Sequence, residues 1–340
     1  MSRGLAIAVL AAALGCTGDI GTIEIDLVAA PGTDPLANAT VARLMLSNPA
    51  REVEVDITDA DELSIDIEAR KEQATVTFLA EDADGNIVAR GQTPPLPLTG
   101  IDFGLTIFIA PPWSMTEAPV SFESGRTGVG SARLSFGAAL VGGVLASGVA
   151  TDEMLIYNVF DHAFQVGEPL PAPRAHSAVL GDPRGLVYIF GGMDENGDDR
   201  STTWRFNTAV PPAGSYATLE SSQTLSRRGS DLVPLGNDQF LVTGAPLAVI
   251  DGFQGTVELI PDGDQVDGPA AAMVVGNDLL PSALIVGADA GVTGAALVRA
   301  SLITALDPPA AARRRGHQVL SLGTKALIVG GRDEGDAFLA

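Results

Sequence analysis

Two short acidic loops, each following a pair of glycines, are the first candidates for chemistry in this sequence. Their oxygen-bearing side chains are Asp194, Asn196, Asp198 and Asp199 in one loop, and Asp333 and Asp336 in the other. Carboxylate and amide oxygens are the ligands that a hard cation such as calcium prefers. The same residue types also form exposed turns. The sequence therefore leaves two interpretations open, a weak calcium site or plain turns.

Residues suited to covalent or metal chemistry are few. Cys16 is the only cysteine, and His162, His176 and His317 are the only histidines. None of the histidines lies in a recognisable nucleophile motif, and no His/Cys spacing is typical of a metal site. We therefore predict a protein that is not an enzyme and needs no cofactor. The alternative is an enzyme that acts on glycans through carboxylates in its loops.

The charge balance limits the partners. The chain has 42 acidic and 20 basic residues, which gives a formal net charge of -22. Such a field repels phosphate backbones and anionic lipid headgroups, so we expect no nucleic-acid partner. Because the acidic residues are spread along the chain, the simplest interpretation is a solvated surface that keeps a β-rich protein soluble.

The amino terminus has the pattern of an export signal. Arg3 precedes an apolar run over residues 5–14, which is too short to span a membrane and has the length of a signal-peptide core. Cys16 follows directly, and the segment ending there resembles the lipobox of bacterial lipoproteins, in which the cysteine is lipidated. The resemblance implies that residues 1–15 are removed and that the lipid on Cys16 anchors the protein to the bacterial cell envelope, at the outer membrane or facing the periplasm. An ordinary secretory peptide is the alternative.

The elements that would position any site are β-strands. Polar and apolar residues alternate over residues 22–27, 52–57 and 63–68, and residues 75–79 and 87–90 flank a turn-forming cluster. Such short strands predict a small β-sandwich, similar to immunoglobulin-like or transthyretin-like modules. Three prolines within residues 94–97 predict a linker after it.

One unit then recurs about five times from Ser121 onward. Apolar strands end in Gly142-Gly143, Gly191-Gly192 and Gly330-Gly331, with weaker copies ending at Gly244 and Gly287. An arginine precedes most of these strands. The repeated arginines are Arg126, Arg174, Arg228 and Arg315. A glycine pair at a strand end permits close approach of neighbouring sheets, and a residue that recurs in most copies is expected to serve the scaffold.

This repeat resembles the kelch repeat. The resemblance implies an all-β fold in which the sandwich is followed by a kelch-type β-propeller of about five blades. Because the last copy lacks outer strands, we expect residues 104–110 to supply one and to close the ring. The expected domains are a signal peptide at 1–15, the lipidated N-terminus and sandwich at 16–100, and the propeller at 101–340. We predict an envelope-anchored binding or structural lipoprotein whose propeller loops contact a protein or a glycan.

Overall fold

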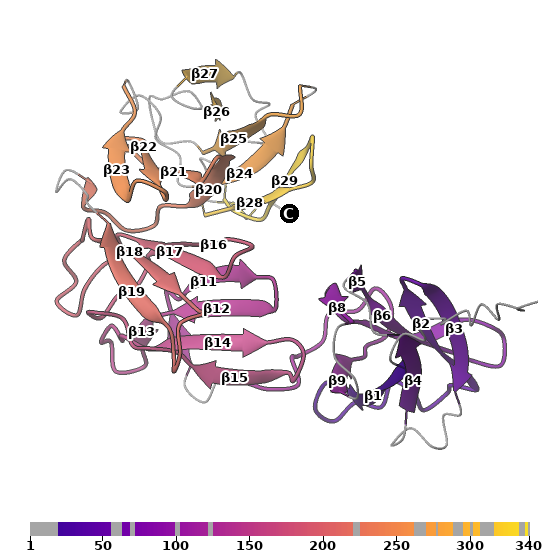
Figure 1. The fold of residues 1–340 in the computed structure, drawn as a ribbon. Coiled ribbons are helices and arrows are strands. Elements are labelled where there is room, and N and C mark those ends of the chain that lie inside the picture. Colours follow the sequence, from indigo (N-terminus) through magenta and orange to yellow (C-terminus); the bar gives the residue numbers. More distant parts are fainter. Residues whose placement is uncertain are drawn as a thin grey trace, which may run out of the picture. The chain divides into compact units, whose positions relative to one another are not determined.

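The computed structural model shows an all-β protein. It describes residues 20–55, 63–68, 72–98, 103–121, 125–219, 225–261, 270–276, 278–287, 295–299, 302–306, 316–332 and 337–338. Within these residues there is no α-helix. The chain divides into two compact units (Figure 1): unit 1 comprises Met1–Ser121 with Val159–His162, and unit 2 comprises Phe122–Asn158 with Ala163–Ala340.

Unit 1 contains three sheets. Its strands are β1 (Ile20–Val28), β2 (Val41–Ser47), β3 (Ala50–Val55), β4 (Leu63–Glu68), β5 (Gln73–Ala74), β6 (Val76–Glu81), β7 (Ile87–Gln92), β8 (Leu96–Pro97) and β9 (Phe103–Phe108). The strand orders are β4-β1-β9, β3-β2-β6-β7 and β5-β8. The predicted hairpin is present as β6 and β7, which are antiparallel. Its turn is held by Asp82, whose Oδ1 accepts the backbone N–H of Asn86 at 2.8 Å.

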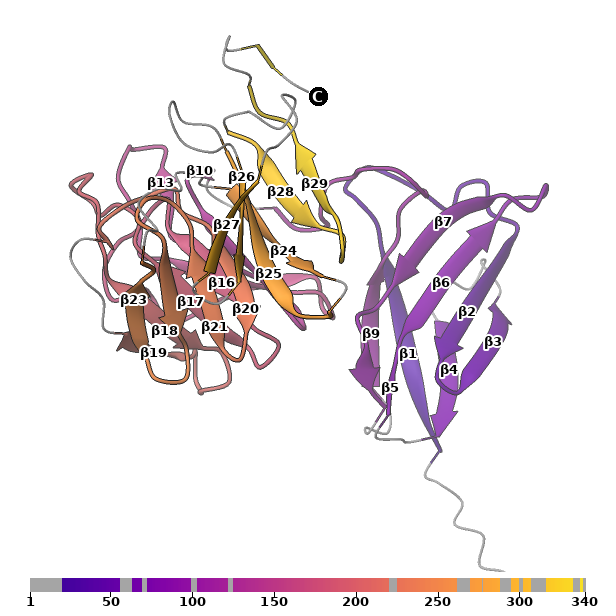
Figure 2. The ribbon, with the colours of Figure 1, turned by 90° about the horizontal axis from the view of Figure 1, so that it is seen from above.

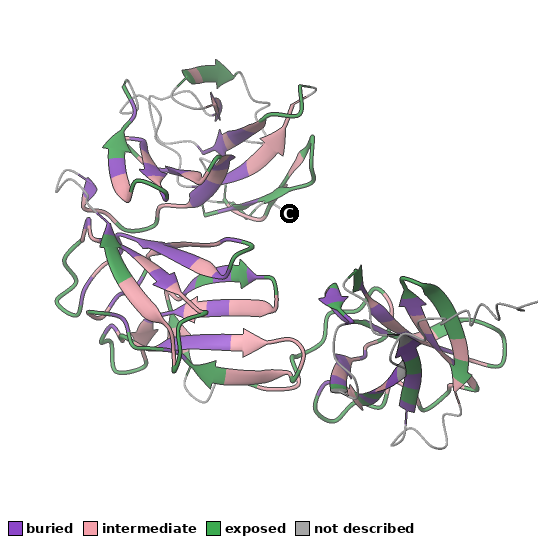
Figure 3. Ribbon diagram, in the orientation of Figure 1, coloured by how far each residue is buried: buried purple, intermediate pink, exposed green. Residues whose placement is uncertain are grey.

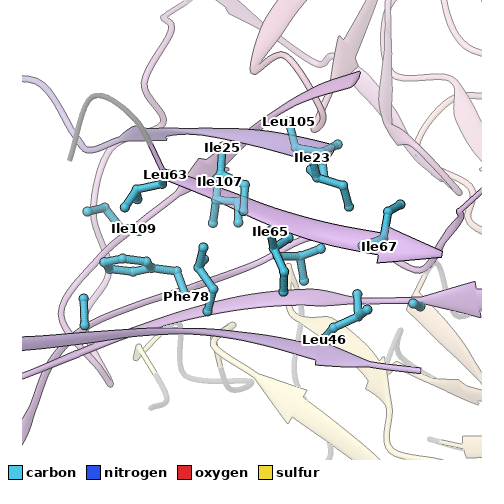
Figure 4. Close-up of a cluster of buried hydrophobic side chains, with 14 of the residues drawn as sticks. Ile23, Ile25, Leu46, Leu63, Ile65, Ile67, Phe78, Leu105, Ile107 and Ile109 are labelled. Atoms are coloured by element: carbon cyan, nitrogen blue, oxygen red, sulfur yellow. The ribbon is translucent and has the colours of Figure 1, made fainter. Parts of the chain in front are cut away.

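Alternating side chains of the two larger sheets build one core in unit 1. Ile23 and Ile25 of β1, Ile65 of β4 and Ile107 of β9 pack in one cluster with Phe78 of β6 (Figure 4). Because side chains of a strand point to opposite faces in turn, the intervening residues stay at the surface. The polar and apolar alternation in the sequence thus predicted which face of each strand is buried.

The expectation that residues 104–110 close a ring with the last repeat is wrong. β9 lies in unit 1, where it pairs in parallel with β1 from Ile23↔Phe103 to Val28↔Phe108. Its apolar side chains, including Leu105 and Ile107, are part of the unit 1 core. An alternating pattern predicts a strand and its buried face but does not name the neighbouring strand. Because β9 belongs to unit 1, this unit extends beyond the linker predicted at residues 94–97, as far as Ser121.

Among the described residues, unit 2 contains four four-stranded sheets and two strand pairs. Sheet 1 is β11 (Gly130–Leu134), β12 (Gly137–Val141), β14 (Met154–Asn158) and β15 (Ala163–Val166). Sheet 2 is β16 (Ala178–Gly181), β17 (Leu186–Phe190), β18 (Thr203–Asn207) and β19 (Ser215–Leu219). Sheet 3 is β20 (Leu232–Gly236), β21 (Gln239–Val242), β22 (Ala248–Asp251) and β23 (Thr256–Leu259). Sheet 4 is β24 (Ala270–Val275), β25 (Pro281–Val286), β26 (Ala295–Arg299) and β27 (Leu302–Leu306).

The remaining strands of unit 2 form two small pairs. β10 (Arg126–Thr127) pairs with β13 (Val144–Leu145), and β28 (Gln318–Ser321) pairs with β29 (Ala326–Val329). We call the second pair the terminal hairpin. In all four larger sheets each strand is antiparallel to the next along the chain, so every sheet is a simple meander.

Each hydrophobic core of unit 2 is built by two consecutive copies of the repeat. Sheets 1 and 2 share a core that includes Val141 and Trp204, and sheets 2 and 3 share one that includes Phe190 and Val242. Sheets 3 and 4 share a third, and sheet 4 shares a smaller one with the terminal hairpin, which lies beside β24 (Figure 2). The repeated motif therefore builds sheets that pack in the order of the chain.

Candidate functional site: the glycine-pair ends of the repeated sheets

The glycine pairs predicted from the repeat each end the second strand of a sheet. Gly142 and Gly143 follow β12 with φ of 58° and 108°, and Gly191 and Gly192 follow β17 with φ of 62° and 85°. These values lie in the left-handed region, which side chains other than hydrogen disfavour. Gly330 and Gly331, after β29, have the same conformation, with φ of 67° and 94°.

Two of the pairs join neighbouring sheets through the backbone. Gly143 donates its N–H to the carbonyl of Arg174 at 2.8 Å, and Gly192 donates in the same way to Arg227 at 2.8 Å. A Cβ on Gly142 would lie 2.0 Å from the carbonyl oxygen of Arg174. Glycine is therefore required by close approach as well as by its backbone conformation, because a side chain would separate the two sheets.

These backbone bonds identify Arg227, and not the predicted Arg228, as the repeated arginine of the third copy. Arg227 accepts from Gly192 as Arg174 accepts from Gly143, and its Nη1 donates to Gly244 O at 3.2 Å. Arg126 makes the equivalent bond to Gly142 O, also at 3.2 Å. Two adjacent arginines fit the sequence pattern equally well, and only their contacts distinguish them. Arg315, predicted for the last copy, lies outside the described residues.

Arg228 instead holds the acidic loop of the preceding sheet. Its Nε donates to Asp199 Oδ1 at 2.5 Å, and its Nη2 donates to Gly197 O at 2.7 Å. The side chain is partly exposed, so this ion pair is screened by solvent. Arg228 nevertheless links the third copy to the loop that follows the glycine pair of the second.

The three equivalent guanidinium groups have different partners. Arg126 forms an ion pair with Glu153, and Arg227 donates to a second carbonyl, that of Pro246, at 2.5 Å. Arg174 lies 4.5 Å above the ring of Trp204 and donates to the carbonyl of Pro173 at 2.8 Å. Burial lowers the pKa of Arg174, and the charge of Arg200 lowers it further.

A single sequence difference accompanies the change of partner between Arg126 and Arg174. The N–H of Gly142 donates to the carbonyl of Glu153, and the N–H of Gly191 donates to that of Thr202, so these two residues are structurally equivalent. Sheet 2 thus has a threonine where sheet 1 has a glutamate. Among the described residues, no carboxylate lies within ion-pair distance of Arg174, and the aromatic face of Trp204 takes its place. Glu153 and Trp204 were not predicted as partners because nothing in their local sequence marks them.

The first acidic loop is closed around Asp194. Its Oδ1 accepts the backbone N–H groups of Asn196 at 2.9 Å and Asp198 at 3.0 Å, and its Oδ2 accepts Nε of Arg200 at 2.8 Å. The hydrogen bond from Arg200 lowers the pKa of Asp194 to about 2. The carboxylate is therefore already neutralised by a guanidinium, while the side chain of Asp199 pairs with Arg228.

Where the chain is described, no three His, Cys, Asp or Glu side chains are placed to hold a metal ion together. In the first loop the carboxylate of Asp194 binds Arg200 and that of Asp199 binds Arg228. Asp333 and Asp336 of the second loop lie outside the described residues, as does Cys16. The turn interpretation accounts for the first loop.

Backbone groups of His176 connect three copies of the repeat. Its N–H donates to Gly128 O at 2.7 Å, and its carbonyl accepts the N–H of Gly229 at 3.0 Å. These three residues stand two positions after Arg126, Arg174 and Arg227, which supports the corrected register. His317 is buried, and its Nε2 lies 3.0 Å from Val286 O of sheet 4. Both histidines therefore contact the neighbouring copy, as the repeat predicted for scaffold residues.

Two loops next to these contacts are exposed. Residues 146–149 follow the first glycine pair and residues 195–199 follow the second, at equivalent places in sheets 1 and 2 (Figure 3). Their backbone is not part of any strand. These two loops are the exposed part of the glycine-pair end, where another molecule can make contact.

No protein-family model matches the sequence, and no curated protein matches it. In the described part of the chain, no helix has the length and apolar character needed to cross a membrane.

Proposed function

We propose that the chain is a non-enzymatic, envelope-anchored lipoprotein that binds a protein or a glycan. In this proposal Cys16 carries the lipid, unit 1 is a small β-sandwich that serves as a spacer, and the repeated sheets are blades of a kelch-type propeller. The exposed loops at residues 146–149 and 195–199 are the contact surface. Localisation at the cell envelope follows from the lipid.

The observation that carries the proposal is the use of the conspicuous side chains as scaffold. Arg126 and Arg227 bind carbonyls at strand ends, and Asp194 is closed on Arg200. Residues engaged in this way hold the sheets together. The exposed loops are not engaged in this way, so binding through them is the function that we propose. Meander sheets that pack in chain order also support the propeller architecture.

The lipid anchor is tested by expressing the full chain in a bacterium fed with a labelled fatty acid. We expect label on the wild-type protein and none on a Cys16→Ser variant, with the mature chain beginning at Cys16. A mature chain that begins elsewhere and carries no label would show that the protein is secreted without a lipid anchor.

Ligand binding is tested with the soluble chain that starts at residue 17, used on a glycan array and as bait in chemical cross-linking with envelope extract. We expect binding that is lost when residues 195–199 are replaced by an unrelated turn, and kept when the exposed turn residue Asp84 of unit 1 is changed to Ala. Release of sugar from an envelope polysaccharide by the soluble chain would instead establish the enzymatic alternative.

A further inference from the structure

Arg174 carries a buried positive charge that has no counterion among the described residues. The residue is only 4% exposed. Within the described part of the chain its guanidinium donates one hydrogen bond, from Nη1 to Pro173 O at 2.8 Å, and its buried Nε has no acceptor there. A guanidinium stays protonated in proteins, and burying a charge without a partner is costly. Sheet 2 therefore contains one half of an ion pair.

Trp204 offsets only part of this charge. The guanidinium carbon of Arg174 lies 4.5 Å from the centre of the indole ring, whose electron-rich face attracts a cation. The ring face has no oxygen to accept the N–H groups at the edge of the guanidinium. These N–H groups are the part of the site that still lacks a partner.

The first copy of the repeat shows what completes such a site. The side chain of Arg126 is also 4% exposed, and it forms an ion pair with Glu153. Glu153 and Thr202 are equivalent, because the carbonyl of each accepts the N–H of the first glycine of its pair. Threonine is shorter than glutamate and carries no charge. Sheet 2 thus keeps the buried arginine but lacks the carboxylate.

The position of the missing carboxylate is accessible from solution. In sheet 1 the side chain of Glu153 is 37% exposed, so the carboxylate meets its buried arginine from the surface. Thr202, at the equivalent position of sheet 2, is half-buried. A dissolved ion can therefore approach along the path that the glutamate side chain takes in sheet 1.

The charged groups near Arg174 do not neutralise it. Burial lowers the pKa of Arg174, and the charge of Arg200 lowers it further, whereas Asp194 and Glu195 act in the opposite direction. Of these two acids, Asp194 is bonded to Arg200 and Glu195 is exposed. Salt at about 0.1 M screens exposed charges more than about 10 Å away, so the formal charge of -22 is spread too widely to repel an anion here.

We propose that sheet 2 binds a small monovalent anion of the size of chloride beside Arg174. The anion takes the place that the carboxylate of Glu153 has in sheet 1 and accepts N–H groups of the guanidinium. Because the carbonyl of Arg174 accepts the N–H of Gly143, a bound anion would also stabilise the contact between sheets 1 and 2. The site does not depend on ligand binding by the exposed loops.

Calorimetric melts of the chain from residue 17 test the proposal. Sodium chloride is exchanged for sodium gluconate at constant ionic strength, which keeps the screening constant while the bulky gluconate is too large for the site. At several times the dissociation constant, chloride should raise the melting temperature of the wild type by about 2–4 °C. In Arg174→Met this increase should be lost, and circular dichroism shows that the variant folds.

Exchanging the two equivalent residues tests the position of the anion. Thr202→Glu supplies the missing carboxylate, so this variant should be more stable in gluconate and should no longer respond to chloride. Glu153→Thr should give the protein a second chloride-dependent site. Thr304→Glu is the matched control, because Thr304 is exposed on β27 of sheet 4 and its replacement should leave the chloride effect unchanged.

Bromide gives a direct readout, because a heavy halide bound beside Arg174 would quench the fluorescence of Trp204. Trp113 is the only other tryptophan and is fully exposed, so it is replaced by Phe. We expect saturable quenching that chloride competes away and that Arg174→Met and Thr202→Glu abolish. An equal chloride effect in the wild type and Thr202→Glu overturns the proposal. Quenching that never saturates, or that Arg174→Met leaves unchanged, overturns it as well.

Discussion

β17 and β29 are two copies of one motif in different surroundings. Each is an apolar strand that ends in two glycines with left-handed backbone. Tyr188, Ile189 and Phe190 of β17 are fully buried between sheets 1 and 3, whereas Leu327 and Val329 of β29 are about half exposed. The comparison shows that the motif determines the local backbone and that burial depends on a neighbouring sheet on each side.

The largest expected difference between the two copies is in core truncation. Phe190→Ala should lower the free energy of unfolding by roughly 3–5 kcal/mol, because a fully buried ring is replaced by a cavity. Leu327→Ala should lower it by less than about 1 kcal/mol, since the side chain is already half solvated. Urea titrations followed by fluorescence measure both values. Equal losses would mean that the terminal hairpin is as well packed as sheet 2.

The glycine pairs should differ in the same sense. A Cβ on Gly142 would meet the backbone of Arg174, whereas a Cβ on Gly330 would have no atom within 4 Å. Both glycines have a positive φ, so each Gly→Ala change should cost about 1–2 kcal/mol through the backbone. Gly142→Ala should cost about 1–3 kcal/mol more, because the two sheets must separate. Thermal melts of the two variants give the difference, and similar melting temperatures would argue against close packing at Gly142.

The arginines sharpen the comparison between neighbouring copies. Arg126→Met removes the ion pair with Glu153 and the bond to Gly142 O, and should destabilise the protein by about 1–3 kcal/mol. Arg174→Met removes a buried charge that has no carboxylate partner in the described chain, so its effect should stay within about 1 kcal/mol. A larger loss for Arg174→Met than for Arg126→Met would contradict the assignment of their partners.

The smallest effect is expected at Asp194 and depends on pH. Arg200 lowers the pKa of Asp194 to about 2 from an ordinary value of 3.8. The stability that this carboxylate contributes is therefore fully present above about pH 4 and is lost as the pH falls towards 2. Asp194→Asn should make the melting temperature less dependent on pH in this range, and an unchanged pH profile would show that the Arg200 contact contributes nothing.

The sequence predicted local structure better than partners. Alternation predicted the buried faces of β1 and β4, and repetition predicted the glycine pairs and the strands before them. The partner of β9 was missed because pairing depends on residues far away in the chain, and Phe103–Phe108 would be an equally good strand in either unit. Arg228 was predicted as the repeated arginine in place of Arg227, because the two residues are adjacent and only their contacts distinguish them. Asp194 was considered as a cation ligand because the sequence alone does not show that its carboxylate pairs with Arg200.

The serial arrangement of cores in unit 2 has a consequence for how the protein opens. Because each core involves only two consecutive copies, the array resembles a row of coupled blocks in which opening one block weakens only those beside it. Hydrogen exchange should then be faster in the terminal hairpin, where Leu327 and Val329 are about half exposed, than in sheets 2 and 3, whose second strands are buried. Opening of the terminal hairpin would then weaken sheet 4 and leave the cores of sheets 1 to 3 intact.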